Sequence, residues 1–293
     1  MTIKLVYPIA FIAFCSASAF AKQPAEFSVT ATNIYNGASE FKNDNTELKR
    51  DTWMLSADSN FQLAQRWKLG FSFGYENENF DWDIALPTLP ISTAIAPWDK
   101  VKTVKASVTL SHILDRNWIL SATPIIQSSY VDGLSMSDAH SYGIVTSGLY
   151  RFESGNMVGV GVAYTNDLNR VRTTPYLAIN WKINDNWKLG NPFKSDFSGP
   201  AGLELSYQLN RDVSFGIGGT LKRDRFLVNG EDISAEIEET VTFIRASWDI
   251  TPQFIASVYA GYNSNGTLEY SHNLGKFDLE GHSAGALSLT YKF

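Results

Sequence analysis

Four histidines are the side chains of this sequence best suited to bind a transition metal. Zinc ligands usually recur at short, regular spacings, and His112, His140, His272 and His282 fit no such pattern. The sequence also lacks the G-x-S-x-G and H-E-x-x-H motifs of serine hydrolases and zinc peptidases. We therefore predict no metal site, no cofactor and no enzymatic activity.

Acidic residues are concentrated in two stretches. They are Glu76, Glu78, Asp81 and Asp83 in the first stretch, and Glu231, Asp232, Glu236, Glu238 and Glu239 in the second. We expect both stretches to form a solvated rim. The alternative is that their oxygens hold divalent cations that bridge to lipopolysaccharide.

A third set of charged residues lies inside segments that are otherwise apolar at every second position. The set is Asp58, Lys105, Arg172, Lys182, Glu204, Lys222 and Arg245. Because side chains alternate between the two faces of a strand, these charges are predicted to share the face opposite the apolar one. Lining a wide barrel, they would make a weakly selective aqueous pore. Alternatively, they pair across the interior and only stabilise a closed barrel.

The period-two alternation recurs along the whole chain and predicts β-strands. In WKLGFSFGYE (67–76) every odd position is apolar, and every even position is polar or glycine. We predict fourteen strands, at 26–35, 52–62, 67–79, 102–112, 118–130, 140–152, 157–166, 171–182, 187–193, 200–209, 213–226, 236–248, 253–270 and 275–293. Alternating segments of about ten residues between turns are typical of membrane barrels. The predicted fold is all-β, a transmembrane antiparallel up-and-down β-barrel of about 14 strands, or 12 if 187–193 merges with a neighbour.

The connections alternate between short and long, which predicts an orientation. Short turns are expected at 63–66, 113–117, 153–156, 183–186, 210–212 and 249–252, whereas 36–51 and 80–101 are long. Bacterial barrels keep short turns in the periplasm, so both termini are predicted to be periplasmic. Next to the short turns lie Trp67, Trp118, Trp181, Trp187 and Trp248, which would form an aromatic girdle. The last two strands alternate without a break and should project beyond the outer surface.

One long connection is unusually apolar. The segment 81–99 reads DWDIALPTLPISTAIAPWD and contains three prolines. Its candidate contact residues are Ile84, Leu86, Leu89, Ile91, Ile95 and Trp98. Long loops of this kind are often functional. The segment could constrict the barrel mouth, lie on the membrane, or bind an apolar solute.

Residues 1–21 have the features of a secretory signal peptide, and residues 22–293 are the predicted barrel. Lys4 precedes an apolar run over 5–14, and Ala19-Phe20-Ala21 resembles a cleavage site. The only cysteine, Cys15, lies in this segment, where the preceding Phe14 argues against lipidation. Removal of one lysine and no acid changes the formal charge from −6 to −7, which disfavours nucleic-acid binding. No later stretch is apolar enough for a transmembrane helix.

The C-terminal sequence resembles the assembly signal of Gram-negative outer-membrane proteins. Apolar residues alternate at Leu289, Tyr291 and the terminal Phe293. The resemblance implies recognition by the barrel-assembly machinery after secretion, and an environment of outer-membrane lipid and lipopolysaccharide. Closure of the sheet would pair this strand with the first one.

A second resemblance covers the middle and last thirds of the chain. The glycine-rich segment 158–164, Pro175-Tyr176, the Trp181 and Trp187 pair, and Pro192 resemble an uncharacterised family of outer-membrane β-barrels, known only as a domain of unknown function. It implies the same fold and location but no activity. We interpret the chain as a monomeric outer-membrane barrel that forms a passive pore. The alternatives are a closed structural or surface-interaction barrel and, least favoured, an outer-membrane hydrolase.

Overall fold

The computed structural model describes residues 26–42, 46–83, 97–168, 170–191, 202–230 and 232–293. Its strands are β1 (Glu26–Asn36), β2 (Ser39–Glu40), β3 (Glu47–Ala64), β4 (Trp67–Asp83), β5 (Lys100–Ile113), β6 (Trp118–Val131), β7 (His140–Arg151), β8 (Met157–Asp167), β9 (Arg170–Lys182), β10 (Trp187–Gly190), β11 (Gly202–Gln208), β12 (Val213–Leu227), β13 (Ser234–Asp249), β14 (Phe254–Tyr270), β15 (Gly275–Leu279) and β16 (His282–Lys292). Two short 3₁₀ helices are η1 (Met136–Asp138) and η2 (Ser271–Asn273). No helix in these ranges is long and apolar enough to cross a membrane.

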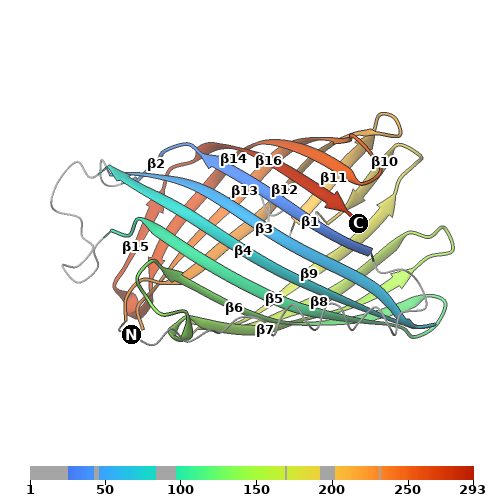
Figure 1. Cartoon of the computed structure of the whole chain (residues 1–293), viewed down its shortest axis with the longest axis horizontal. Helices are drawn as coiled ribbons and strands as arrows, with labels where there is room; N and C mark the ends of the chain where they lie inside the picture. The colour runs from blue at the N-terminus through green and yellow to red at the C-terminus, as the bar shows by residue number, and fades with distance from the viewer. Residues whose placement is uncertain (1–25, 43–45, 84–96, 169, 192–201, 231) are drawn as a thin grey trace.

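The strands form one antiparallel sheet that closes on itself (Figure 1). β1 pairs with β3 on one side and with β16 on the other. β15 and β16 both pair with β14, one after the other, and so count as one strand of the wall. The two-residue β2 pairs with β3 and is not counted. The 16 labelled strands therefore make a wall of 14. This confirms the predicted strand number and excludes the alternative of 12. We call the end with the short turns and Phe293 the turn end, and the opposite end the loop end.

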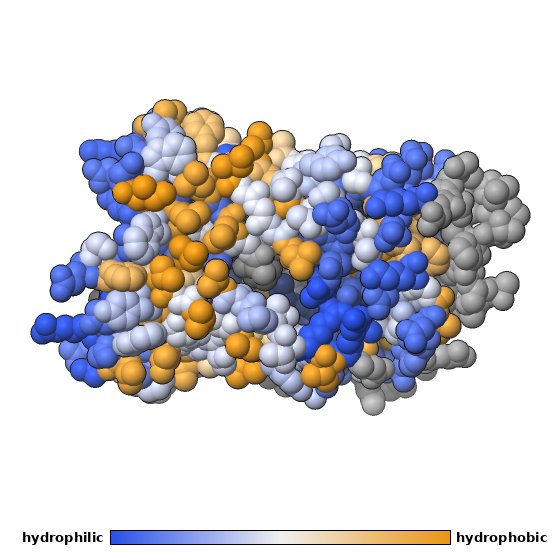
Figure 2. Space-filling model, turned by 180° about the vertical axis from the view of Figure 1, so that it is seen from behind, coloured by the Kyte–Doolittle hydropathy of each residue, from blue (hydrophilic) through white to orange (hydrophobic). Residues whose placement is uncertain are grey.

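The outside of the barrel is apolar over the half nearer the turn end. Outward-facing Phe73, Val160, Val162, Leu177, Phe215, Ile217, Ile244 and Val258 are 42 to 66% exposed. On the face that Figure 2 shows, apolar side chains gather over that half, with hydrophilic ones toward the loop end. There the long strands β3 and β4 carry the exposed Lys49 and Asp81, which lie opposite each other in the strand register. A closed sheet with an apolar exterior satisfies its backbone internally, as a bilayer requires.

The tryptophans predicted to lie next to the short turns do so. Trp67, Trp118 and Trp187 begin strands, and Trp181 and Trp248 stand one residue before strand ends. Several turns share one geometry. The side chains of Asp115, Asn184 and Asn210 each accept hydrogen bonds from the backbone N–H groups two and three residues later. The bonds from Trp118 and Asn117 lower the pKa of Asp115.

At the loop end, the hairpin of β12 and β13 bends into the barrel. Its tip residue Leu227 forms a parallel bridge with Tyr130 of β6, although β7 to β11 separate the two strands in the sheet. Leu227 is buried against Ala139 and Leu168, in the β6–β7 and β8–β9 connections. The hairpin therefore spans the interior. We call the described residues 222–230 and 232–238 the inserted hairpin.

The prediction of unbroken alternation along the last two strands is wrong. A β-bulge in β14 places Asn265 at a φ of 52°, and the β13–β14 register shifts between Glu238 and Thr240. Tyr262 before the bulge is 50% exposed, whereas Tyr270 after it is 2% exposed. A bulge adds one residue to one strand and so reverses which face its later side chains occupy. The connections predicted at 36–51 and 80–101 are also shorter, because β3 begins at Glu47 and β4 ends at Asp83.

We expect Gly159→Ala to destabilise the barrel by about 1 to 3 kcal/mol, the usual cost of overpacking. A Cβ at Gly159 would lie 2.8 Å from Leu149 Cα and closer still to the Gly148 carbonyl, both backbone atoms that cannot move aside. Urea unfolding of the refolded barrel measures this. Gly74→Ala is the matched control, because its Cβ meets only Lys105 Cε at 3.8 Å. Equal stability of the two variants would contradict the expectation.

Candidate functional site

The interior near the turn end is lined by hydroxyl groups and is open to water. Lys105 of β5 points inward and is nevertheless exposed. Inward hydroxyl groups bond across neighbouring strands in the pairs Thr30–Thr290 (2.9 Å), Thr32–Ser288 (2.9 Å), Thr109–Thr123 (3.0 Å), Ser121–Ser147 (2.6 Å) and Ser247–Ser257 (2.7 Å). Small hydroxyl side chains leave space along the axis of a barrel of this width.

One ion pair crosses this polar wall. Arg245 Nη2 lies 2.5 Å from Glu204 Oε1, and the two side chains are 15% and 11% exposed. The pair spans β12 above Gly216, where a Cβ would lie 2.5 Å from Glu204 Oε1. Arg245 also donates to the hydroxyls of Ser214 and Ser247. Glycine at 216 therefore makes room for a fixed charge pair on the wall.

Further toward the loop end, the interior contains buried charges. Arg50 Nη2 lies 2.5 Å from Glu239 Oε1, and Arg50 Nη1 lies 3.7 Å from Glu78 Oε1. These three side chains are 2 to 4% exposed. Asn263 donates to Glu239 at 3.3 Å and contacts His282 Nε2 at 3.2 Å. Because buried charges are costly without partners, this set of five residues, the buried charge network, forms a fixed polar layer across the barrel.

Beyond this layer, the interior is filled by aromatic rings. The aromatic cluster consists of Phe41, Phe80, Trp82, Trp98, Phe226, Tyr270 and Phe277. Ring centroids of contacting pairs are 5.1 to 6.2 Å apart. Trp98 touches four of the other rings and is 4% exposed. Packed aliphatic side chains, such as Leu48 and Ile237, complete a dry plug at the loop end.

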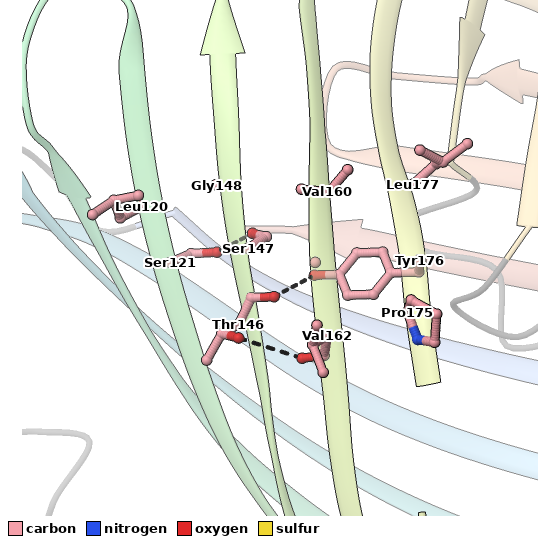
Figure 3. A pocket seen from close by; sticks show the side chains of 11 residues that line it. Leu120, Ser121, Thr146, Ser147, Gly148, Val160, Val162, Pro175, Tyr176 and Leu177 are labelled. Atoms are coloured by element: carbon pink, nitrogen blue, oxygen red, sulfur yellow. Dashed lines mark hydrogen bonds between the residues drawn. The ribbon is translucent and has the colours of Figure 1, made fainter. Parts of the chain in front are cut away.

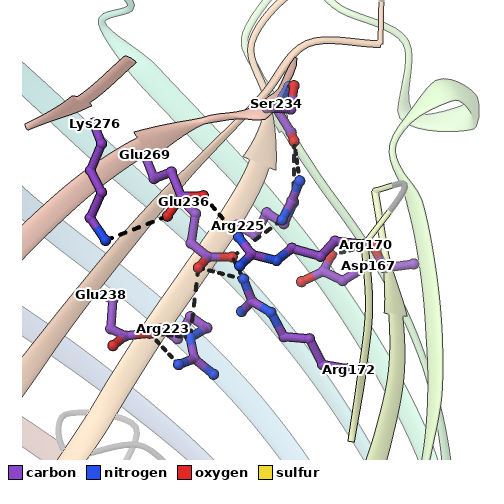
Figure 4. A network of polar contacts seen from close by, with 12 residues as sticks. Asp167, Arg170, Arg172, Arg223, Arg225, Ser234, Glu236, Glu238, Glu269 and Lys276 are labelled. Atoms are coloured by element: carbon purple, nitrogen blue, oxygen red, sulfur yellow. Dashed lines mark hydrogen bonds and ion pairs between the residues drawn. The ribbon is translucent and has the colours of Figure 1, made fainter. Parts of the chain in front are cut away.

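The other face of the inserted hairpin is held by ion pairs (Figure 4). Glu236 of β13 accepts from Arg172 of β9 at 2.5 Å and from Arg225 of β12 at 3.4 Å. Arg223 pairs with Glu238, and Arg170 lies 3.1 Å from Glu269. β10 and β11 have only four and seven described residues, and at this level β9 reaches the hairpin directly. We call these pairs the arginine network.

The predicted interior charges take part in different interactions. Arg172 belongs to the arginine network, Glu204 pairs with Arg245, and Lys222 lies 3.0 Å from Asp224. Asp58 and Lys105 occupy inward positions, whereas Lys182 pairs with Asp185 at a turn and is 61% exposed. Their role in lining a pore stays a prediction.

Other predicted residues lie on the surface or outside the described ranges. Leu289, Tyr291 and Phe293 face outward and are 37 to 73% exposed, and their role as an assembly signal stays a prediction. In the apolar segment, Ile84, Leu86, Leu89, Ile91 and Ile95 lie outside the described residues. Trp98 is buried in the aromatic cluster.

The expectation that both acidic stretches form a solvated rim is wrong in part. Glu78, Glu236 and Glu239 are 2 to 6% exposed and paired with arginines, while Asp81 and Asp83 are exposed. Sequence reasoning missed Arg50 and Glu239 as partners, because 189 residues separate them. Within the described ranges, no group of three His, Cys, Asp or Glu residues could hold a metal ion.

One serine and one histidine are hydrogen-bonded at the loop end. Ser128 Oγ lies 2.6 Å from His140 Nδ1. Ser128 is only 2% exposed, so a substrate cannot reach its hydroxyl. Among the described residues, no carboxylate is hydrogen-bonded to His140. The pair therefore lacks the access and the orienting acid that a nucleophilic serine needs.

A depression of about 740 Å³ lies on the barrel wall across β6 to β9 (Figure 3). Its apolar lining includes the outward-facing Leu120, Val160, Val162 and Leu177. The Tyr176 ring packs over Gly161, and its hydroxyl donates to the Thr146 carbonyl at 3.5 Å. Because most of its lining side chains face outward and are apolar, hydrocarbon would fill this depression in a bilayer, and we do not consider it a solute site.

Comparison with known proteins identifies a family and a fold. The family model described as "Domain of unknown function (DUF6268)" matches residues 98–277. No curated protein sequence matches the chain. The COG4313 outer membrane channel from Pseudomonas putida F1 is similar in structure, with a TM-score of 0.51, 12% identity and coverage of 94% of this chain and 98% of that one.

Two other solved barrels are more distant. They are a Pseudomonas aeruginosa FadL homologue (TM-score 0.48, 11% identity, 92% of this chain and 89% of that one) and the KdgM porin (TM-score 0.38, 8% identity, 91% and 99%). At 12% identity, the similarity to the COG4313 channel shows a shared barrel fold and nothing more.

We expect Arg245→Ala to make ion flow through the barrel more cation-selective, and Glu204→Ala to make it more anion-selective. Each substitution leaves the other charge unpaired on the inner wall of the barrel. The shift is measured as the reversal potential in a KCl gradient. The substitutions are made in barrels whose plug has been opened by Trp98→Ala/Phe226→Ala. Arg211→Ala, at an exposed turn, should leave the potential unchanged. Shifts of the same sign in both test variants would contradict this arrangement.

Proposed function

The chain belongs to this family of unknown function, and we propose that its barrel is a channel of the Gram-negative outer membrane. In this proposal the loop end faces the exterior, and both termini lie in the periplasm. The apolar belt, the closed backbone and the tryptophans at the turn end support a membrane location. The fold shared with an outer-membrane channel is consistent with this function.

One observation carries the proposal. The interior is lined by hydroxyl groups near the turn end, where the inward Lys105 is exposed, yet it is filled by the aromatic cluster at the loop end. A purely structural barrel has no need for a polar, accessible interior, and a permanently open pore has no plug. We therefore propose a passive channel that is closed in this state and opens when the inserted hairpin moves.

The plug also favours a second function. A barrel that stays shut would act as a structural or surface-interaction protein. Its loop end, with exposed charged groups such as Lys49 and Asp81, would be the interacting surface. This alternative predicts that no reasonable loosening of the plug produces a conducting state.

Conductance in planar bilayers separates the two functions. The double variant Trp98→Ala/Phe226→Ala removes two contacting rings from the plug, whose centroids are 5.3 Å apart. We expect wild-type protein to conduct rarely and the variant to give frequent, ohmic steps. Phe215→Ala is the control, because Phe215 lies on the same strand but faces outward, at 44% exposure. A silent but folded double variant would favour the structural barrel.

Orientation can be tested independently, because the only cysteine of the chain is Cys15 in the predicted signal peptide. We expect Lys276→Cys, at the loop end, to react with a membrane-impermeant maleimide on intact cells. Arg211→Cys, at the turn end, should react only after the outer membrane is permeabilised. Both positions are exposed in the barrel. The reverse pattern would place the loop end in the periplasm.

A further inference from the structure

Two buried polar groups in the aromatic cluster have no hydrogen-bond partner among the residues that the structure describes. They are the indole Nε1 of Trp98 and the hydroxyl of Tyr270. The residues are 4% and 2% exposed, and their ring centroids are 6.0 Å apart. An unpaired buried donor costs about 1 to 3 kcal/mol, so two in one cluster require an explanation.

Among the described residues, the neighbouring side chains offer no acceptor to either group. The neighbouring Trp82 does donate its indole N–H, to the backbone carbonyl of Trp98 at 2.8 Å. The contacting side chains of Phe80, Phe226 and Phe277 offer rings but no acceptor. A buried water normally needs two to four polar partners and suits this apolar setting poorly.

We propose that the aromatic cluster is a binding site for a neutral apolar molecule that carries one carbonyl group, such as an aromatic ketone or ester. A carbonyl oxygen has two lone pairs and accepts from both Trp98 and Tyr270. The apolar body of the ligand lies among the rings, which favour edge-to-face contacts. A carboxylate is the wrong class, because two neutral donors do not offset the burial of a full charge.

The site differs in character from the rest of the interior. In the buried charge network and the Glu204–Arg245 pair, the arginines and carboxylates already have ionic partners. The aromatic cluster instead offers unmatched donors in a dry setting, and it lies at the loop end, where β15 and the inserted hairpin meet. The inference is tested by a binding measurement, which does not require that the barrel conducts ions.

The test compares acetophenone with ethylbenzene, which has the same ring and nearly the same shape but no acceptor. Binding to the refolded mature barrel in dodecyl maltoside is measured by equilibrium dialysis, corrected with empty micelles. We expect acetophenone to bind about tenfold more tightly, the effect of one to two net hydrogen bonds. Tyr270→Phe should reduce this preference to about threefold or less, as should Trp98→Phe.

Two controls exclude a merely structural effect. Tyr262→Phe changes a tyrosine of the same strand that faces outward, and it should keep the tenfold preference. Tyr270→Phe removes a hydroxyl that has no partner, so the ligand-free barrel should melt at the same or a higher temperature. Equal binding of the two compounds to wild type, or a preference that survives Tyr270→Phe, would overturn the proposal. If the plug variants failed to change the conductance, the channel proposal would fall, but this binding proposal would not.

Discussion

The backbone of this protein must satisfy its own hydrogen bonds, because the hydrocarbon that an apolar outer surface requires offers no donors or acceptors. That constraint forces the sheet to close, and β1 accordingly pairs with both β3 and β16. At the seam, the Phe293 N–H donates to the Phe27 carbonyl at 2.9 Å. Closure then fixes the interior: with apolar side chains committed to the outside, the alternate positions must be polar or small. The hydroxyl pairs and the Glu204–Arg245 pair follow from it.

Toward the loop end the same strands are surrounded by water. There their polar side chains face outward and their apolar side chains face the interior. Lys49 and Asp81 are exposed on the outside, while Phe80 and Tyr270 are buried inside. In water the stable arrangement places apolar groups in the interior. The bulge at Asn265 makes the change in β14, since one extra residue turns Tyr270 inward. The barrel is therefore a membrane protein in one half and resembles a water-soluble one in the other.

This reversal also explains what the sequence could and could not predict. Alternation and turn residues predicted the strand number, because each strand near the turn end has one apolar face in a fixed register. The bulge could not be predicted, because the period-two alternation of apolar residues continues in the sequence from Tyr262 to Tyr270, on both sides of it. The buried role of Glu239 was missed, because its partner Arg50 is 189 residues away and only the closed barrel brings the two within reach. Glu78, on the strand next to Arg50, was missed because its burial depends on this same interior pairing. Local patterns carry no information about such pairs.

The inserted hairpin is held on its two faces by interactions of different kinds. On one face, Glu236 and its partners Arg172 and Arg225 are 6 to 16% exposed, and breaking such a buried ion pair costs about 3 to 5 kcal/mol. On the other face, the rings of the dry aromatic cluster contribute through burial and edge-to-face contact. Closure therefore rests on both faces, and the rings also surround the donors of Trp98 and Tyr270. A ligand that enters among these rings has to separate them, so binding and opening act on the same contacts. Because such coupling is reciprocal, any change that loosens the hairpin would also alter affinity for the ligand.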